Sequence, residues 1–162
     1  IDVHSAPGEG TTITLFFKAV RDHGAGGQGE TITLASFRGS ETILVVDDVR
    51  EQRELAEMLL SHLGYSVATV ASGEEAVAWL QTRTADLVVL DMIMDPGIDG
   101  LDTYRLITKQ HPGQKAIITS GYSETDRVHE AQRIGAGAYV HKPYLLHTLG
   151  QAVRAELDRR VV

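Results

Sequence analysis

The chain has 162 residues, of which 43% are hydrophobic, and this length suits one well-buried domain with an appendage better than two full domains. The net charge of −7 is spread along the chain without a basic stripe, so direct binding of nucleic acid is not expected. No cysteine is present, which excludes disulfides and thiolate metal sites, and no apolar run could span a bilayer; we therefore expect a soluble, cytoplasmic protein without membrane contact.

The first forty residues are predicted to contain strands joined by a glycine-rich connection. Residues 12–18 and residues 30–37 alternate in strand fashion. The GAGGQG string between them fits a nucleotide-binding pattern, but a strand-like run follows it instead of a helix, which favours a flexible linker. We expect a hairpin or two loosely attached strands, which could also pair with a second copy of the chain. Because the chain opens on Ile1 in mid-pattern, we expect a fragment of a longer protein.

From Glu41 onward, short apolar runs alternate with amphipathic stretches of helical length. The predicted strands are rich in Val, Ile and Leu, as expected where helices cover both faces of a sheet, and they comprise residues 42–47, 66–70, 86–90, 115–119 and 137–140. The helices between and after them begin near residues that can cap a helix or enter its first turn, namely Val49, Ser72, Asp99, Ser123 and Leu145. This alternation predicts an α/β fold with a doubly wound parallel sheet of five strands and five helices.

The first predicted helix carries an apolar stripe. Leu55, Leu59 and Leu63 recur at four-residue spacing, with Met58 beside them. We expect this stripe to enter the core, and Gly64 to end the helix.

Polar side chains follow four of the five predicted strands. Asp47 and Asp48 follow the first strand, Asp91 the third and Lys142 the fifth, and Thr119 ends the fourth. The carboxyl ends of parallel strands meet at one edge of the sheet, where ligands bind. Three carboxylates that meet there repel one another unless a cation is present, and Mg²⁺ prefers oxygen ligands and accepts phosphate oxygens. The pattern predicts a site for phosphoryl transfer, with Asp91 as nucleophile and the adjacent pair holding the metal.

The segments ILVVDD, LVVLDMIM, AIITSG and YVHKPY resemble the consecutive signature segments of response-regulator receiver domains, over about residues 41–160. The resemblance implies a flavodoxin-like strand order, 2-1-3-4-5, and a cis peptide between Lys142 and Pro143. It implies the following roles: Mg²⁺ ligands Asp47, Asp48, Asp91 and the backbone carbonyl of Ile93; phosphoacceptor Asp91; phosphoryl contact Lys142; switch residues Thr119 and Tyr139.

By this resemblance, the domain is a phosphorylation-controlled switch and not an enzyme that acts on an external substrate, although a receiver catalyses its own phosphorylation and dephosphorylation. The donor would be a histidine on a histidine-kinase dimerisation domain or on a histidine phosphotransfer protein. Phosphorylation would change the surface formed by the fourth helix, the fifth strand and the fifth helix.

The N-terminal segment HSAPGEGTTITLFF resembles the last glycine-containing box and closing strands of the histidine-kinase ATP-binding domain. The earlier boxes of that domain are missing, so no ATP site is expected. Together the two resemblances imply a hybrid sensor histidine kinase, with a kinase remnant at residues 1–18, a glycine-rich linker with one further strand at 19–40, and a receiver at 41–162.

The sequence departs from the receiver pattern after Asp91. It reads DMIMDPGIDG, with Asp95 inserted before Pro96, so we expect a loop one residue longer than usual. The two positions that tune hydrolysis in the family hold Ile93 and Gly121, whose side chains cannot orient a water molecule by hydrogen bonding. We therefore expect a long-lived phosphoaspartate.

Other interpretations remain open for single residues. Asp48 alone could be a helix cap or a solvated turn residue, and Tyr139 could be an ordinary half-buried tyrosine. A rival function is an aspartyl phosphatase or mutase of the HAD-like kind, but such enzymes need a second acid two residues after the nucleophile, where this chain has Ile93. A pseudo-receiver that is never phosphorylated is disfavoured, because every site position is filled.

Overall fold

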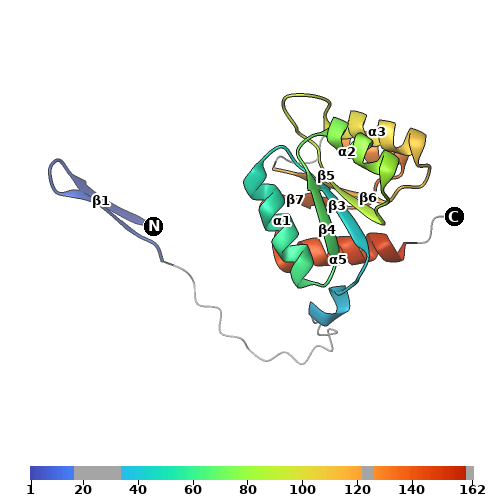
Figure 1. Cartoon of the computed structure of the whole chain (residues 1–162). Coiled ribbons are helices and arrows are strands. Elements are labelled where there is room, and N and C mark those ends of the chain that lie inside the picture. The colour runs from blue at the N-terminus through green and yellow to red at the C-terminus, as the bar shows by residue number, and fades with distance from the viewer. Residues whose placement is uncertain (17–33, 122–125, 160–162) are drawn as a thin grey trace. The chain divides into compact units, whose positions relative to one another are not determined.

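The computed structural model describes residues 1–16, 34–121 and 126–159, and the chain divides into two compact units, Ile1–Thr31 and Ile32–Val162 (Figure 1). The second unit contains a parallel sheet with helices on both faces. In the described parts of the chain, no helix combines the length and the apolar character needed to cross a membrane.

The first unit contains an antiparallel hairpin of β1 (Asp2–Ala6) and β2 (Gly10–Thr14). Gly8 and Gly10, at φ values of 82° and 89°, allow the tight connection, because glycine enters the left-handed region without steric cost. The strand predicted at residues 12–18 begins two residues earlier and ends at Thr14, and its partner is an upstream segment that the sequence analysis did not identify. The last two residues of the predicted strand lie outside the described part.

The strand predicted at residues 30–37 is wrong over its second half, because Leu34–Phe37 form a 3-10 helix, η1. The Phe37 side chain is only 4% exposed and its ring meets the ring of His147 edge-on, with centroids 5.2 Å apart. The hydroxyl of Tyr65 donates a hydrogen bond of 2.7 Å to the Phe37 carbonyl. Tertiary packing therefore overrides the alternating pattern here. Residues 30–33 and the GAGGQG string lie outside the described residues.

The sheet of the second unit is parallel throughout. Its strands are β3 (Thr42–Val46), β4 (Ser66–Val70), β5 (Leu87–Asp91), β6 (Ala116–Ser120) and β7 (Tyr139–His141). The strand order is β4-β3-β5-β6-β7, which confirms the predicted order 2-1-3-4-5. All residues of β5 and β6 are buried, as expected of strands covered on both faces.

Five described helices flank this sheet, and they are α1 (Arg50–His62), α2 (Gly73–Thr82), α3 (Gly100–Gln110), α4 (Asp126–Ile134) and α5 (Leu146–Asp158). Side chains of α1, α5 and η1 pack into one apolar cluster with one face of the sheet. Side chains of α2, α3 and α4 form a second cluster on the opposite face. The doubly wound fold is confirmed, and it leaves the carboxyl ends of the strands free for polar residues.

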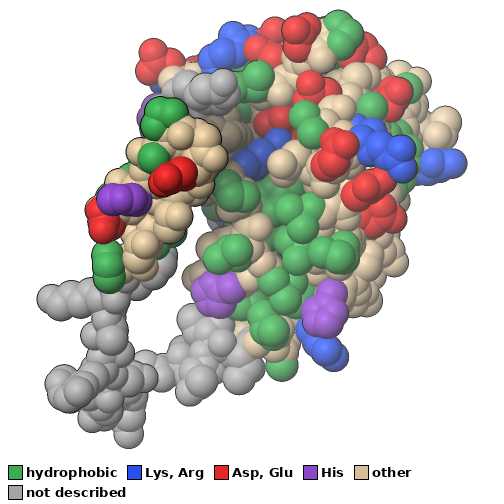
Figure 2. Space-filling view, turned by 90° about the vertical axis from the view of Figure 1, so that its left-hand side faces the viewer, with side chains coloured by type: hydrophobic (Ala, Val, Ile, Leu, Met, Phe, Trp, Pro, Cys, Tyr) green, Lys and Arg blue, Asp and Glu red, His purple; other side chains and the backbone are tan. Residues whose placement is uncertain are grey.

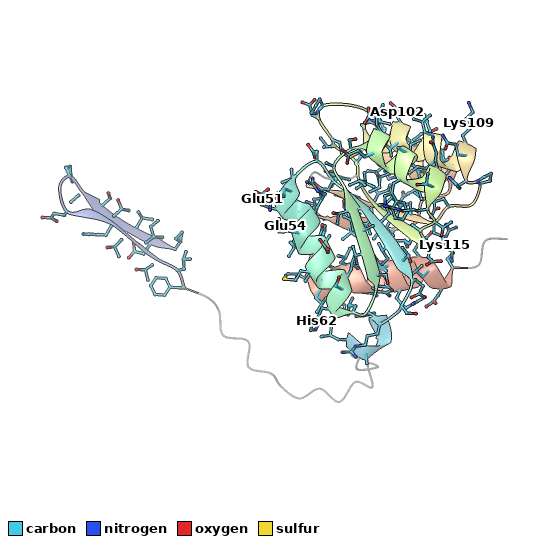
Figure 3. The ribbon with its side chains drawn as sticks, in the orientation of Figure 1. Glu51, Glu54, His62, Asp102, Lys109 and Lys115 are labelled. Carbon is cyan, nitrogen blue, oxygen red and sulfur yellow. The ribbon has the colours of Figure 1, made fainter. Side chains whose placement is uncertain are left out.

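Two predicted helix caps are confirmed. Ser72 accepts a hydrogen bond from the amide of Glu75, and Asp99 accepts one from the amide of Asp102. Asp102 lies in the first turn of α3 and Lys109 in its last turn, so both charges complement the helix dipole (Figure 3). The predicted cap Ser123 lies outside the described residues.

The apolar stripe predicted for α1 is displaced. The fully buried residues of the helix are Ala56 and Leu60, and they continue to the buried Leu63 just after it. Leu55 and Leu59 are only half-buried against this cluster, while Met58 is 61% exposed. The stripe that faces the sheet follows the i, i+4, i+7 series from Ala56, rotated by about one residue from the prediction. Figure 2, which views the molecule from the side where α1 lies, shows hydrophobic side chains on the outer surface there.

Candidate functional site

Three carboxylates meet at the carboxyl edge of the sheet. Asp47 and Asp48 follow the end of β3, and Asp91 is the last residue of the neighbouring strand β5. One carboxylate oxygen from each residue lies within 4.8 Å of the others. Asp47 and Asp91 are buried, with exposed fractions of 2% and 5%, and Asp48 is half-buried. The structure therefore brings together the three acids that the sequence analysis selected.

Lys142 supplies a positive charge to this cluster from the loop after β7. Its Nζ atom lies 2.9 Å from Oδ2 of Asp91 and also contacts Oδ2 of Asp47. The amide of Lys142 donates to the carbonyl of Ser120, which holds the loop against β6, and the peptide to Pro143 is cis, as predicted. One ammonium faces three carboxylates, so the site keeps an excess of negative charge that a cation could neutralise.

Backbone and side-chain contacts hold the acidic pair in place. Oδ1 of Asp47 accepts a hydrogen bond of 2.9 Å from the amide of Val49. Arg53, on α1, donates to the carbonyls of Asp47 and Asp48 at 2.6 and 3.0 Å. The residue that caps α1 is Val49, which has no side-chain cap bond, so Asp48 is not the helix cap that its position allowed. The sequence analysis did not identify Arg53, although a cation one turn after the acidic pair is a detectable signal.

Burial raises the pKa of the Asp91 carboxyl, while Lys142 opposes this shift and the charge of Asp47 adds to it. The amide of Ile93 lies 3.4 Å from Oδ1 of Asp91, and the Ile93 side chain is 49% exposed. Gly100 begins α3 directly against Asp91, because a Cβ atom at this position would lie 2.3 Å from the Asp91 carbonyl oxygen. Only glycine therefore allows α3 to start so close to the site.

Thr119 and Tyr139 lie on the neighbouring strands. Thr119 is buried and pairs with Asp91 in the register between β5 and β6. Tyr139, the first residue of β7, is half-buried, and its hydroxyl donates to the carbonyl of Ser120 at 3.4 Å. Thr119 therefore lies on the strand beside Asp91 and Tyr139 on the next strand, and the switch roles of both residues stay a prediction.

Tyr144 is a further residue that the sequence analysis missed. It is 4% exposed, and its hydroxyl donates to the carbonyl of Gln52 on α1 at 3.4 Å. Burial raises the pKa of the Tyr144 phenol, and the negative charges of Asp47 and Asp91 raise it further. The hydroxyl therefore stays protonated beside the acids, and it links the loop after Lys142 to α1. The sequence places this tyrosine two residues after Lys142, in the segment HKPY, and that position could have indicated its role.

Residues 43–154 match the response regulator receiver domain family. The chain is 33% identical over 122 residues to the C4-dicarboxylate transport transcriptional regulatory protein DctD of Rhizobium meliloti (strain 1021), a match that covers 75% of this chain and 26% of that protein. It is 37% identical over 117 residues to the transcriptional regulatory protein CpxR of Klebsiella pneumoniae, covering 72% of this chain and 49% of the relative. The chain thus spans only about a quarter to a half of the length of these relatives.

Solved structures show the same similarity. NtrX from Brucella abortus superimposes with a TM-score of 0.70 at 30% identity, over 74% of this chain and 27% of that chain. A CheY-like receiver domain protein from Methanospirillum hungatei JF-1 superimposes with a TM-score of 0.69 at 27% identity, over 74% of this chain and 95% of that chain. The fold, the order of the segments and the match over residues 43–154 agree, and the chain belongs to the response-regulator receiver family.

Proposed function

We propose that this chain is the phosphoacceptor of a two-component phosphorelay and that Asp91 takes a phosphoryl group from a histidine of a partner protein. The observation that carries the proposal is the position of Lys142, whose Nζ atom lies 2.9 Å from the Asp91 carboxylate inside a cluster of three acids. One cation would be enough to neutralise a single buried aspartate, whereas here one ammonium is shared by a cluster of three acids.

The residues of the cluster fit Mg²⁺, because they offer oxygen ligands and an excess of negative charge at one edge of a sheet. Asp47, Asp48 and Asp91 would hold the ion, and the family resemblance adds the carbonyl of Ile93. When bound, the ion neutralises the oxygens of the transferring phosphoryl group.

The reaction that we propose is an in-line displacement at phosphorus. An oxygen of the Asp91 carboxylate forms a bond to phosphorus as the phosphorus–nitrogen bond to the donor imidazole breaks. The electron pair of that bond stays on the imidazole nitrogen, which takes up a proton from water. Lys142 lies close enough to Asp91 to pair with a phosphoryl oxygen, and it would then give up part of its contact with Asp47.

We further propose that phosphorylation changes the surface formed by α4, β7 and α5. Thr119 would follow the new phosphoryl group, because it pairs with Asp91 on the adjacent strand β6, and Tyr139, on the next strand β7, would turn inward. A cavity of about 540 Å³ lies between β7 and α5, and Tyr139 and Leu145, which is 69% exposed, line it. Such an apolar hollow beside the switch residue supports a role in binding a protein partner.

The parent protein that we propose is a hybrid sensor histidine kinase, with the part described by this chain in the cytoplasm, whether or not the parent carries a membrane anchor. Support comes from the hairpin β1–β2, whose sequence resembles the closing strands of the histidine-kinase ATP-binding domain. Val3 and Ile13 pair across this hairpin and are 55% and 60% exposed. An isolated two-stranded hairpin is marginally stable in water, which fits a piece of a larger sheet.

The test is phosphorylation by a small donor. The chain is incubated with Mg²⁺ and acetyl phosphate, or with phosphoramidate, whose phosphorus–nitrogen bond imitates phosphohistidine, and the added mass is mapped to a residue. Asp91→Asn should lower the labelling rate at least about 100-fold, because the nucleophile is lost. The matched control is Asp95→Asn, which removes an exposed carboxylate on the same loop and should label as the unmodified chain does. Equal labelling of Asp91→Asn, or no labelling of the unmodified chain by either donor, would contradict the proposal.

A further inference from the structure

The loop between β5 and α3 contacts the acid cluster through the inserted residue. The amide of Asp95 donates a hydrogen bond of 3.3 Å to Oδ2 of Asp48. Asp48 is the most exposed of the three acids, and the bond from the Asp95 amide is the described contact of its carboxylate. The orientation of Asp48 therefore depends on where this loop lies.

The same loop also contacts α2, through Ile98, three residues after Asp95. Oε1 of Glu74 accepts a hydrogen bond of 3.1 Å from the amide of Ile98. Gly97, with φ at 121°, has the conformation that favours glycine. A Cβ atom at Gly97 would lie only 2.9 Å from Oε2 of Glu74, so a side chain at this position would displace the carboxylate.

Glu74 lies at the start of a helix that is itself held in place, so its carboxylate can hold the loop. It is the second residue of α2, a helix whose start is capped by Ser72 and which packs against α3. Its own amide and the amide of Ile98 hold the pKa of the Glu74 carboxyl below its usual value, so the acceptor is ionised at neutral pH. Glu75, the next residue, makes a different contact, because its carboxylate accepts from the amide of Ala71, before its own helix.

We propose that Glu74 is a positioning residue, which holds the β5–α3 loop against Asp48 and thereby sets the affinity of the site for Mg²⁺. This inference rests on the proposed function, because it assumes that the acid cluster binds the ion. It assigns a role to α2, although β4, the strand that precedes α2, carries no acid of the cluster. Glu74 acts through the loop and touches none of the reacting groups.

The experiment compares Mg²⁺ binding by the whole chain and by three variants, with titration calorimetry. Glu74→Ala should raise the dissociation constant for Mg²⁺ roughly 3- to 10-fold, somewhat less than is usual for a partner that touches a metal ligand directly. Glu74→Gln should stay close to the unmodified chain, because its amide oxygen can still accept from Ile98. Glu75→Ala is the matched control, since it removes the same charge from the same turn without touching the loop, and it should also bind as the unmodified chain does.

A second readout separates positioning from general damage. At saturating Mg²⁺, labelling of Glu74→Ala by acetyl phosphate should reach the rate of the unmodified chain, because Asp91 and Lys142 are unchanged. Unaltered Mg²⁺ affinity in Glu74→Ala overturns the inference. An equal loss of affinity in Glu75→Ala or in Glu74→Gln also overturns it, because the loss would then be an effect of charge alone. If the unmodified chain binds no Mg²⁺, the proposed function fails with it; if the chain binds Mg²⁺ and labels on Asp91, only the role of Glu74 is in question.

Discussion

The two ends of the five-stranded sheet each hold a buried carboxylate beside a cation, but they differ in charge balance. At the carboxyl end, Lys142 is shared by Asp47 and Asp91, with Asp48 close by. At the amino end, Glu156 is 4% exposed and accepts two hydrogen bonds, of 2.6 and 2.9 Å, from Arg159. The cluster at the carboxyl end keeps surplus negative charge, whereas the Glu156–Arg159 pair is neutral.

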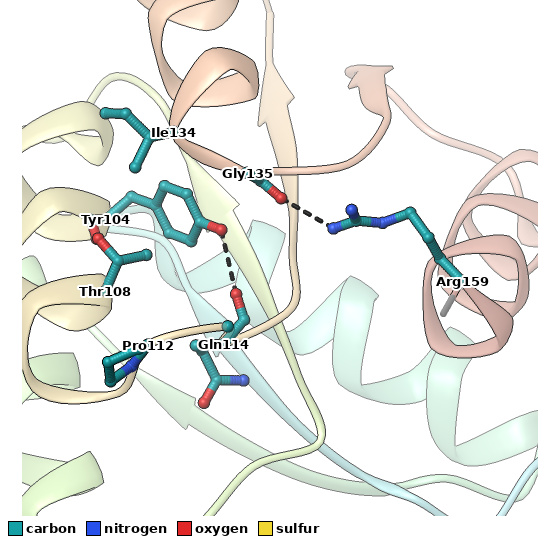
Figure 4. Close-up of a pocket in the computed structure, with 8 residues that line it drawn as sticks. Tyr104, Thr108, Pro112, Gln114, Ile134, Gly135 and Arg159 are labelled. Atoms are coloured by element: carbon teal, nitrogen blue, oxygen red, sulfur yellow. Dashed lines mark hydrogen bonds between the residues drawn. The ribbon is translucent and has the colours of Figure 1, made fainter. Parts of the chain in front are cut away.

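The amino end is also saturated with hydrogen bonds. A nitrogen of Arg159 donates to the carbonyl of Gly135 at 2.8 Å, and the hydroxyl of Tyr104 donates to the carbonyl of Gln114 at 3.0 Å (Figure 4). These residues line a cavity of about 310 Å³ whose polar groups already have partners. Burial of an acid therefore does not by itself identify a functional site. A buried cluster in which acids outnumber cations is the stronger indication, because its excess negative charge favours the binding of a further cation.

The largest effect on stability is expected at the amino end. Glu156→Gln should lower the free energy of unfolding by about 2 kcal/mol, because a charge-assisted pair of hydrogen bonds in a buried setting is lost. Urea unfolding measures this, and labelling of Asp91 should be unchanged. Glu130→Gln is the control, because it removes a more exposed carboxylate that pairs with Arg133, and it should cost less than about 1 kcal/mol. If folded Glu156→Gln lost its labelling, the two ends would not be separable.

The next effect concerns the lifetime of the phosphoaspartate, which only the carboxyl end should control. We predict slow loss of the phosphoryl group in the unmodified chain, because the Ile93 side chain offers no hydrogen bond to a water molecule. Ile93→Asn should speed the loss by at least about tenfold, since an amide can orient that water. Release of label from purified phosphorylated protein measures it. Leu106→Asn, at an apolar position that is 41% exposed on α3, should have no effect. A lifetime of seconds in the unmodified chain would contradict the prediction.

The smallest effect is a gain of stability at the carboxyl end. In buffer with a chelator, Asp91→Asn should raise the free energy of unfolding by on the order of 1 kcal/mol at neutral pH, because it relieves repulsion with Asp47 and leaves Lys142 paired. The opposite sign from Glu156→Gln would confirm that the two ends differ in charge balance.

The pH dependence of this gain follows from the raised pKa of Asp91. Because burial raises the folded-state pKa, the folded chain holds this proton at pH values where the unfolded chain has released it. The Asp91 carboxylate therefore lowers stability as the pH rises through that window. The advantage of Asp91→Asn should shrink as the pH falls toward 3.8, the ordinary value for aspartic acid. An advantage that stays constant down to that pH would contradict the assignment of a raised pKa.

Much of the site could be predicted because parallel strands place their carboxyl ends at one edge. Asp47, Asp48 and Asp91 follow apolar runs that form β3 and β5, and the two strands are neighbours. The caps Ser72 and Asp99 were also predictable, because a cap bond spans only three residues. In contrast, the contacts of Asp95 and Glu74 join segments far apart in the chain, and no local pattern announces them.

The sequence by itself determined the class of fold and the residue types at the functional edge, because period, capping and strand ends are local properties, and its resemblance to receiver domains implied the order of the strands. Only the tertiary structure decided that one ammonium lies between two carboxylates, that α1 buries Ala56 and Leu60, and that η1 packs through Phe37 where a strand was expected. These outcomes depend on how helices lie on the sheet, since a rotation of one residue exchanges buried and exposed side chains and a contact across the fold can outweigh local preference.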